Sequence, residues 1–161
     1  ELLTAAKQDV DRGLNSLRTT VHGIHPQVLQ DHGLVAALAD AASSHGPHVS
    51  VFAPHPLPKL SASVLACGYF FGTEALTNAA KYAPGAPVSV LVTADASLKI
   101  TVVDEGPGGA RVVQGHGLAG MAERLAAFGG EMTLSSPPGG PTRVSGSIPL
   151  LLNRGQSGVQ S

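Results

Sequence analysis

Three polar side chains recur at helical spacing in the middle of the chain, and their chemistry matches a site for a metal ion and phosphate. Glu74, Asn78 and Lys81 are four and three residues apart, which places them in one stripe of a helix. The stripe continues backwards through Phe71 and Cys67, so it is expected to face the protein. Buried charges need partners. A carboxylate, an amide oxygen and an ammonium would find them in a divalent cation and phosphates, whereas a solvated helix edge is an equally open interpretation of this helix alone.

Two glycine clusters follow this helix and favour the first interpretation. The cluster at 104–109 reads DEGPGG and begins with an acid at the end of an expected strand, and the cluster at 115–120 reads GHGLAG and enters an expected helix. Glycine lets a backbone approach a ligand closely, and the free N–H groups of a helix N-terminus favour phosphate. Each glycine cluster, taken alone, is also compatible with an ordinary loop, and Asp104, taken alone, is compatible with the first residue of a turn. The three motifs in this order therefore carry more weight than any one of them.

These motifs resemble the ATP-binding domain of sensor histidine kinases. The resemblance covers roughly residues 33–149 and rests on the pattern Glu-x-x-x-Asn-x-x-Lys-Tyr-Ala from Glu74, followed by the two glycine clusters. It implies the Bergerat fold that gyrase-type and chaperone ATPases share. This fold is an α/β two-layer sandwich with helices on one face of a mostly antiparallel sheet, which the expected order of helices and strands also favours.

The resemblance implies roles for individual residues, with ATP and Mg²⁺ as the ligands. Glu74 would be the catalytic carboxylate, Asn78 the magnesium ligand and Asp104 the residue that reads adenine. Tyr82 stands where this class often carries histidine, and Pro107 interrupts the first glycine box. The other expected ATP contacts are Lys81, Tyr82, Gly106, Gly108, Gly109, Gly115, His116, Gly117, Leu118 and Thr142. Residues 110–114, between the glycine clusters, correspond to the ATP lid and are expected to be mobile without nucleotide.

The apolar periodicity predicts the helices that carry these motifs. A helix over about 33–45 is expected, with Asp31 as a candidate cap, and a long helix that contains Glu74 is expected to begin at Ser61 or Ser63. A third helix over 118–128 should end at the glycine pair 129–130.

Alternating residues predict the strands. Val49 and Val51 indicate a short strand, the runs 88–93 and 98–102 an antiparallel hairpin, and the runs 132–134 and 142–149 a final hairpin. Asp104 continues the parity of the apolar residues in its strand, so its side chain should point to the apolar face.

The chain is expected to divide into three parts. Residues 1–30 are interpreted as the second helix of a dimerisation hairpin and its linker, 31–149 as the catalytic ATP-binding domain, and 150–161 as a disordered tail. The stretch 21–29 resembles the class of histidine kinases that pair with helix-turn-helix, LuxR-like response regulators. Leucine, valine and isoleucine at heptad spacing support the dimerisation helix, namely Leu3, Val10, Leu17 and Ile24, and Lys7 interrupts this seam.

Composition narrows the class of partner. The 161 residues carry a net charge of −1 without a basic run, which argues against nucleic acid. The single cysteine excludes an internal disulfide and fits a reducing, cytoplasmic compartment. No apolar run is long enough for a membrane segment, and no signal peptide opens the chain, although the full-length protein would allow membrane attachment through upstream segments.

The expected function is that of a histidine kinase without its acceptor. His22, His25 and His32 precede glycine or proline rather than an acid, so no phosphoacceptor is expected in this chain. The γ-phosphate of Mg-ATP would go to a histidine on an upstream helix of the homodimer and then to a response-regulator aspartate. Two alternatives remain: an anti-sigma-factor serine kinase, or a non-catalytic ATP-binding module that docks a partner.

Overall fold

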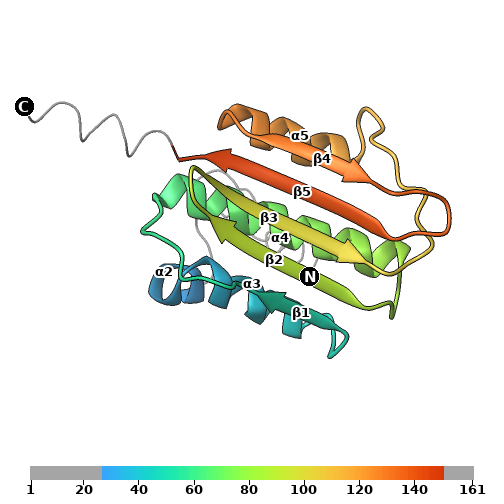
Figure 1. Cartoon of the computed structure of the whole chain (residues 1–161), viewed down its shortest axis with the longest axis horizontal. Helices are drawn as coiled ribbons and strands as arrows, with labels where there is room; N and C mark the ends of the chain where they lie inside the picture. Colours follow the sequence, from blue (N-terminus) through green and yellow to red (C-terminus); the bar gives the residue numbers. More distant parts are fainter. Residues whose placement is uncertain (1–26, 151–161) are drawn as a thin grey trace, which may run out of the picture.

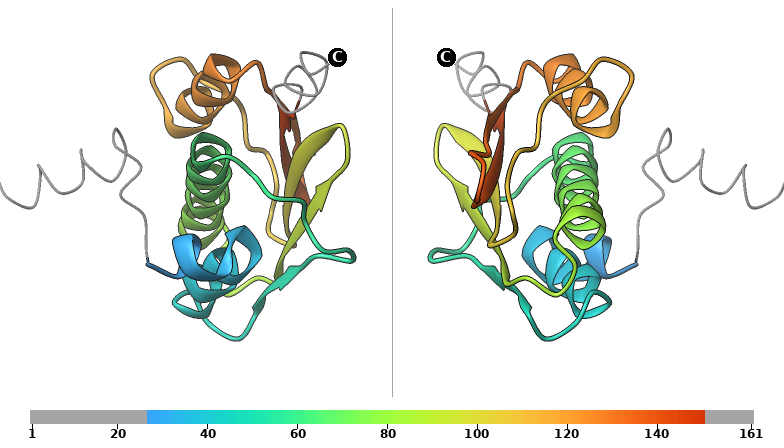
Figure 2. Two further views of the ribbon diagram at one scale, coloured as in Figure 1. Left: turned by 90° about the vertical axis from the view of Figure 1, so that its left-hand side faces the viewer. Right: turned by 90° about the vertical axis from the view of Figure 1, so that its right-hand side faces the viewer.

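The computed structural model describes residues 27–150 of the chain. Within this range one mixed sheet of five strands is covered by helices on a single face (Figures 1 and 2). This arrangement confirms the expected two-layer α/β sandwich. Of the expected dimerisation helix and linker over 1–30, residues 1–26 lie outside the described residues, as do residues 151–161 of the tail expected over 150–161. The expected start of that tail at residue 150 is wrong, because the Leu150 N–H donates to the Ala96 carbonyl at 3.0 Å and its side chain packs against the core.

The sheet has the strand order β1-β2-β3-β5-β4. The β2–β3 and β4–β5 pairs are the two antiparallel hairpins expected from the alternation of apolar residues. The first strand pairs in parallel with β2, and the last strand in sequence lies between β3 and β4. The strand bounds are β1 (Val49–Phe52), β2 (Val88–Ala94), β3 (Ser97–Asp104), β4 (Glu131–Ser135) and β5 (Thr142–Pro149).

The long helix α4 (Ala62–Tyr82) crosses from β1 to β2 behind the sheet. Ser61 caps its N-terminus, because the Ser61 hydroxyl accepts a hydrogen bond from the Val64 N–H at 3.2 Å. This decides between the two serines that the sequence offered. Gly72 brings α4 against the preceding helix so closely that an added Cβ would lie 2.4 Å from Leu38 Cδ2.

Two short helices precede β1, and their junction corrects one expectation. Gly33, at φ +90°, separates α2 (Gln27–His32) from α3 (Leu34–Ser43) and is the N-cap of α3 without a side-chain hydrogen bond. The prediction that Asp31 caps this helix is wrong. Asp31 lies inside α2, where its carboxylate accepts from Gln27 Nε2 at 3.0 Å. The domain boundary at residue 30 stays a prediction, although Leu29 of α2 is fully buried in the core of the described domain.

The helix α5 (Gly117–Ala127) ends at the glycine pair expected from the sequence. Gly129, at φ +73°, donates to the Ala126 carbonyl at 2.9 Å, and Gly130 donates to the Leu125 carbonyl at 2.7 Å. These two bonds form the Schellman arrangement, which satisfies carbonyls at the end of the helix. The helix thereby stops where β4 begins.

The core lies between the sheet and the helices and is built mainly from Val, Leu, Ile and Ala. Val90, Val92 and Leu98 of the sheet are fully buried, and Leu76 of α4 and Leu125 of α5 are almost fully buried against them. This core holds α4 and α5 on the same side of β3 and β5. None of the described helices is long and apolar enough to cross a membrane.

Candidate functional site

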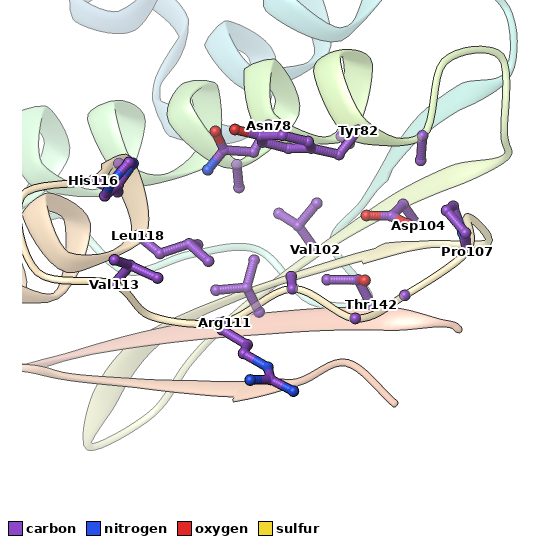
Figure 3. Close-up of a pocket in the computed structure, with 18 residues that line it drawn as sticks. Asn78, Tyr82, Val102, Asp104, Pro107, Arg111, Val113, His116, Leu118 and Thr142 are labelled. Atoms are coloured by element: carbon purple, nitrogen blue, oxygen red, sulfur yellow. The ribbon is translucent and has the colours of Figure 1, made fainter. Parts of the chain in front are cut away.

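A cavity of about 400 Å³ opens where α4, α5, β3 and β5 meet (Figure 3). Its volume lies in the range of small-molecule sites in proteins, roughly 300–1,000 Å³. Four elements contribute, together with the loop that joins β3 to α5. The residues that line it are Ala75, Asn78, Ala79, Tyr82, Ala83, Val102, Asp104, Pro107, Gly108, Gly109, Ala110, Arg111, Val113, His116, Gly117, Leu118, Thr142 and Val144.

One end of the cavity is formed by the paired ends of β3 and β5. Asp104 and Thr142 face each other in the antiparallel register, and both line the cavity. The Asp104 side chain is half-buried, as its strand parity predicted, and points into the cavity (Figure 3). Its Oδ1 accepts the Gly106 N–H at 3.0 Å, which fixes the carboxylate and leaves the second oxygen for a ligand.

The other end is formed by α4 and the beginning of α5. Asn78 is half-buried, and its Nδ2 donates to Met121 Sδ at 3.6 Å. The amide lies beside Gly117, where an added Cβ would be 3.8 Å from Asn78 Oδ1 and 4.0 Å from Nδ2. Gly117 begins α5, so the partial positive charge of the helix N-terminus lies beside the Asn78 amide.

The charged lining is sparse. Asp104 is the carboxylate of the lining, and Arg111 and His116 supply the basic side chains. Both basic residues are exposed and come from the loop between β3 and α5. The floor between the two ends is apolar, with Ala75 of α4 and Val102 of β3 among its residues. An arrangement of this kind fits a flat apolar group in the middle, a hydrogen-bond donor near Asp104 and an anion near α5.

The structure brings most of the expected site residues together. Those that line the cavity are Asn78, Tyr82, Asp104, Gly108, Gly109, His116, Gly117, Leu118 and Thr142. Tyr82 is 68% exposed, so it forms an outer wall and not part of the floor.

Four expected residues, namely Glu74, Lys81, Gly106 and Gly115, are not in the lining. Gly106 supports Asp104 from behind through its N–H. The expected inward orientation of Lys81 is wrong, because its side chain is exposed. The buried stripe of α4 runs through Ala75 and Ala79, and Glu74 is turned from Ala75 by about 100° around the helix, which leaves it half-buried.

Sequence reasoning missed several lining residues. Arg111 and Val113 lie in the segment assigned to the lid but were not singled out. Ala75, Val102 and Val144 form the floor, and nothing distinguishes them in the sequence from other core residues. Two of them could have been found from their position alone, because Ala75 lies three residues before Asn78 on α4 and Val102 two residues before Asp104 on β3.

The segment that forms the cavity matches a known protein family. Residues 73–152 match the family described as histidine kinase-, DNA gyrase B-, and HSP90-like ATPase. The chain carries a domain of this ATPase family. The matched segment begins on α4 just before Asn78 and includes every strand and loop of the cavity beyond that point.

The ATPase domain is homologous to sensor histidine kinases. Over 90% of its length the chain is 29% identical to the sensor histidine kinase MctS of Rhizobium johnstonii, and it spans 35% of the length of that relative. The chain is thus related to an ATP-binding domain of the histidine kinase family and covers about a third of a whole kinase of this kind.

Solved structures agree on the fold. The blue-light activated histidine kinase of Erythrobacter litoralis matches with a TM-score of 0.59 and 21% identity, over 73% of this chain and 45% of that one. The ATP binding domain of PrrB from Mycobacterium tuberculosis matches with a TM-score of 0.50 and 24% identity, over 72% of this chain and 90% of that one. The two-layer arrangement of the ATPase domain is therefore that of histidine kinase ATP-binding domains.

Proposed function

We propose that the ATPase domain binds Mg-ATP with adenine at the Asp104 end of the cavity and the phosphates at the α5 end. In the full-length protein the γ-phosphate would pass to a histidine on an upstream dimerisation helix and then to an aspartate of a response regulator. The observation that carries this proposal is the polarity of one cavity. A fixed carboxylate lies at one end, and an amide oxygen and a helix N-terminus lie at the other.

The end of the cavity formed by Asp104 and Thr142, called the base end here, has the groups that adenine needs. The exocyclic amino group of adenine is a hydrogen-bond donor, and the free oxygen of Asp104 is an acceptor held in place by Gly106. Thr142 lies opposite and adds a hydroxyl. Ala79 and Val102 provide apolar surface for the ring between these polar groups.

The end of the cavity formed by Asn78 and the start of α5, called the phosphate end here, fits a magnesium ion held by few protein ligands. Among the residues that the structure describes, no group of three His, Cys, Asp or Glu side chains could hold a metal by itself. Mg²⁺ commonly binds through one or two protein oxygens together with substrate phosphates and water. Asn78 Oδ1 fits that role, because its Nδ2 is already bonded to Met121. The bound ion would neutralise phosphate charge, and the N–H groups at the start of α5 would hold the same phosphates.

Glu74 remains our candidate for the catalytic carboxylate. It lies four residues before Asn78 on α4 but outside the lining of the cavity. A proton acceptor in this position would act on a nucleophile that arrives from outside the domain, as a histidine on another helix would. Lys81 would meet phosphate only after its exposed side chain reorients.

A calorimetric titration with a non-hydrolysable ATP analogue, with and without Mg²⁺, tests the binding part of this proposal. The wild-type chain should bind more tightly with Mg²⁺, and Asn78→Ala should lose most of that difference. Thr77→Ala is the matched control, because Thr77 is the exposed neighbour whose hydroxyl donates to the Thr73 carbonyl. Binding that is equal with and without Mg²⁺ would contradict the proposal and favour the non-catalytic docking module.

A labelling experiment on the full-length protein tests the transfer part. With ATP labelled in the γ-phosphate, the protein should acquire an acid-labile phosphoryl group, and the Glu74→Gln variant should acquire it much more slowly while binding ATP normally. An acid-stable phosphoserine on a partner protein would instead support the anti-sigma-factor type of serine kinase.

A further inference from the structure

The turn between β4 and β5 is bonded to the first glycine cluster at several points. The Gly109 N–H donates to the Ser136 carbonyl at 3.0 Å, and the Gly139 N–H donates to the Pro107 carbonyl at 2.8 Å. The Ala110 N–H donates to Ser136 Oγ at 2.8 Å. These bonds join the β4–β5 turn to the residues where the β3–α5 loop begins. The turn itself does not line the cavity, whereas Thr142, which follows it, does.

Two glycines allow this close approach. A Cβ added at Gly108 would lie 2.0 Å from the Pro137 carbonyl oxygen, and one added at Gly140 would lie 2.0 Å from the Gly106 carbonyl oxygen. Contacts this short cannot be relieved by a side-chain movement, because the opposing atoms belong to the backbone. Both glycines also have positive φ, +69° and +80°. The two segments are thus fitted to each other along their backbones.

The Ser136 hydroxyl connects this contact to a side chain of the cavity. Ser136 Oγ accepts from the Ala110 N–H and lies 2.6 Å from Thr142 Oγ1. A serine hydroxyl has one proton and two lone pairs, so it can hold both partners at once. Thr142 lines the cavity opposite Asp104, and Ala110 is the first residue of the segment assigned to the lid. One half-buried hydroxyl therefore fixes the base end of the cavity and the start of the lid together.

We propose that Ser136 is a positioning residue of the nucleotide site, which holds Thr142 and Ala110 in the geometry that accepts the base. This inference rests on the proposed function of the cavity. Ser136 does not line the cavity, so its effect on a ligand is exerted through these two residues. The phosphate end, with Asn78 and Gly117, has no bond to this network and should not be affected.

The location of Ser136 predicts which ligands lose affinity on substitution. Ser136→Ala should weaken binding of adenosine and of the ATP analogue by the same factor, about tenfold, because Thr142 and Ala110 lose the hydroxyl that holds them in place. The ratio between affinities with and without Mg²⁺ should not change. A merely structural role would lower the melting temperature without this selective loss of affinity for the base.

The experiment measures the dissociation constants of adenosine and of the ATP analogue, well below the melting temperature, for four proteins. These are the wild type, Ser136→Ala, Ser136→Thr and Ser135→Ala. Ser136→Thr keeps the hydroxyl and should restore affinity to within about threefold of wild type. Ser135→Ala is the matched control, since the neighbouring serine is exposed. If Ser136→Ala does not fold, Ser136→Cys, which offers a much weaker donor and acceptor, takes its place with the same expectation.

The outcomes separate this inference from the proposed function. Wild-type affinity in Ser136→Ala would overturn the inference and leave the proposed function standing. Absence of binding by the wild type would overturn the proposed function. In that case amide hydrogen exchange at Ala110 decides the remaining point, because it should be faster in Ser136→Ala, and unchanged exchange would overturn the role of Ser136.

Discussion

The polar side chains of the cavity differ in how firmly their neighbours hold them. Asp104 is fixed by Gly106, Asn78 by Met121 and Thr142 by Ser136. The basic residues Arg111 and His116 are exposed on the loop between β3 and α5. The groups proposed to contact the base and the metal are thus held by neighbours without a ligand, whereas the two basic residues of the loop are not held in the same way.

Arg111→Ala should therefore weaken the ATP analogue and leave adenosine unchanged. The loss should be a few-fold, about 1 kcal/mol at low salt for an exposed charge, and should shrink as the ionic strength rises. Calorimetric titration at two salt concentrations measures it. Arg143→Ala is the control, because Arg143 is an exposed arginine on β5 outside the lining. An equal loss for adenosine would show that Arg111 supports the base and not the phosphates.

Cys67 should be nearly inert toward alkylation. Burial raises the pKa of its thiol from 9.0 to about 11, and the positive charge of Arg124 offsets part of that increase. Because the thiolate is the reactive form, the rate at pH 8 should be about a hundredfold below that of the unfolded chain. Iodoacetamide labelling followed by mass spectrometry, with the urea-unfolded chain as control, measures the ratio. Similar rates in both states would contradict the burial of this thiol.

Helical spacing and strand parity place a side chain correctly when its orientation depends only on the helix or strand that carries it. The parity of β3 directs Asp104 toward the cavity, and the spacing on α4 brings Asn78 there. Lys81 was misplaced because the apolar residues before it did not reveal which side of α4 the sheet covers. Ser136 was missed because its partners are 26 residues before it and six residues after it. Such contacts depend on strand order, which the sequence pattern does not contain.

At the scale of elements, α4 and α5 are the two helices that position the site. Their helical extents and caps could be predicted, since Ser61 and the glycine pair after α5 are local signals. The parallel pairing of β1 with β2 could not be predicted. An alternating strand buries the same face in either direction, so its side-chain pattern does not specify the partner's direction.

The close approach of α3 to α4 gives a prediction about two glycines. Gly72→Ala should destabilise the domain by about 1–2 kcal/mol, because the new methyl group would meet Leu38 at 2.4 Å and force it to move. Gly120→Ala, also within a helix but with nothing within 4 Å, should instead stabilise by up to about 1 kcal/mol. Urea unfolding measures both free energies. A Gly72→Ala variant as stable as the wild type would show that α3 is not held against α4 in this way.

At the scale of the whole molecule, the described residues form one domain of the histidine kinase-like ATPase family. The chain spans 35% of the sensor histidine kinase to which it is homologous. The cavity lies between the helices α4 and α5 and the strands β3 and β5, beside the β3–α5 loop (Figure 3). Under the proposed function, ATP and an acceptor from outside the domain would both approach the side on which this loop lies.

The central claim is that this cavity recognises the base through Asp104, and titration of the wild type and Asp104→Asn with adenosine tests it most directly. Adenosine lacks phosphates, so neither magnesium nor the α5 end contributes to its binding. The account predicts measurable binding by the wild type and a loss of at least about tenfold in Asp104→Asn, because the amide that replaces the carboxylate presents a donor to the adenine amino group or turns away from Gly106. Equal affinity of the two proteins for adenosine would contradict the account.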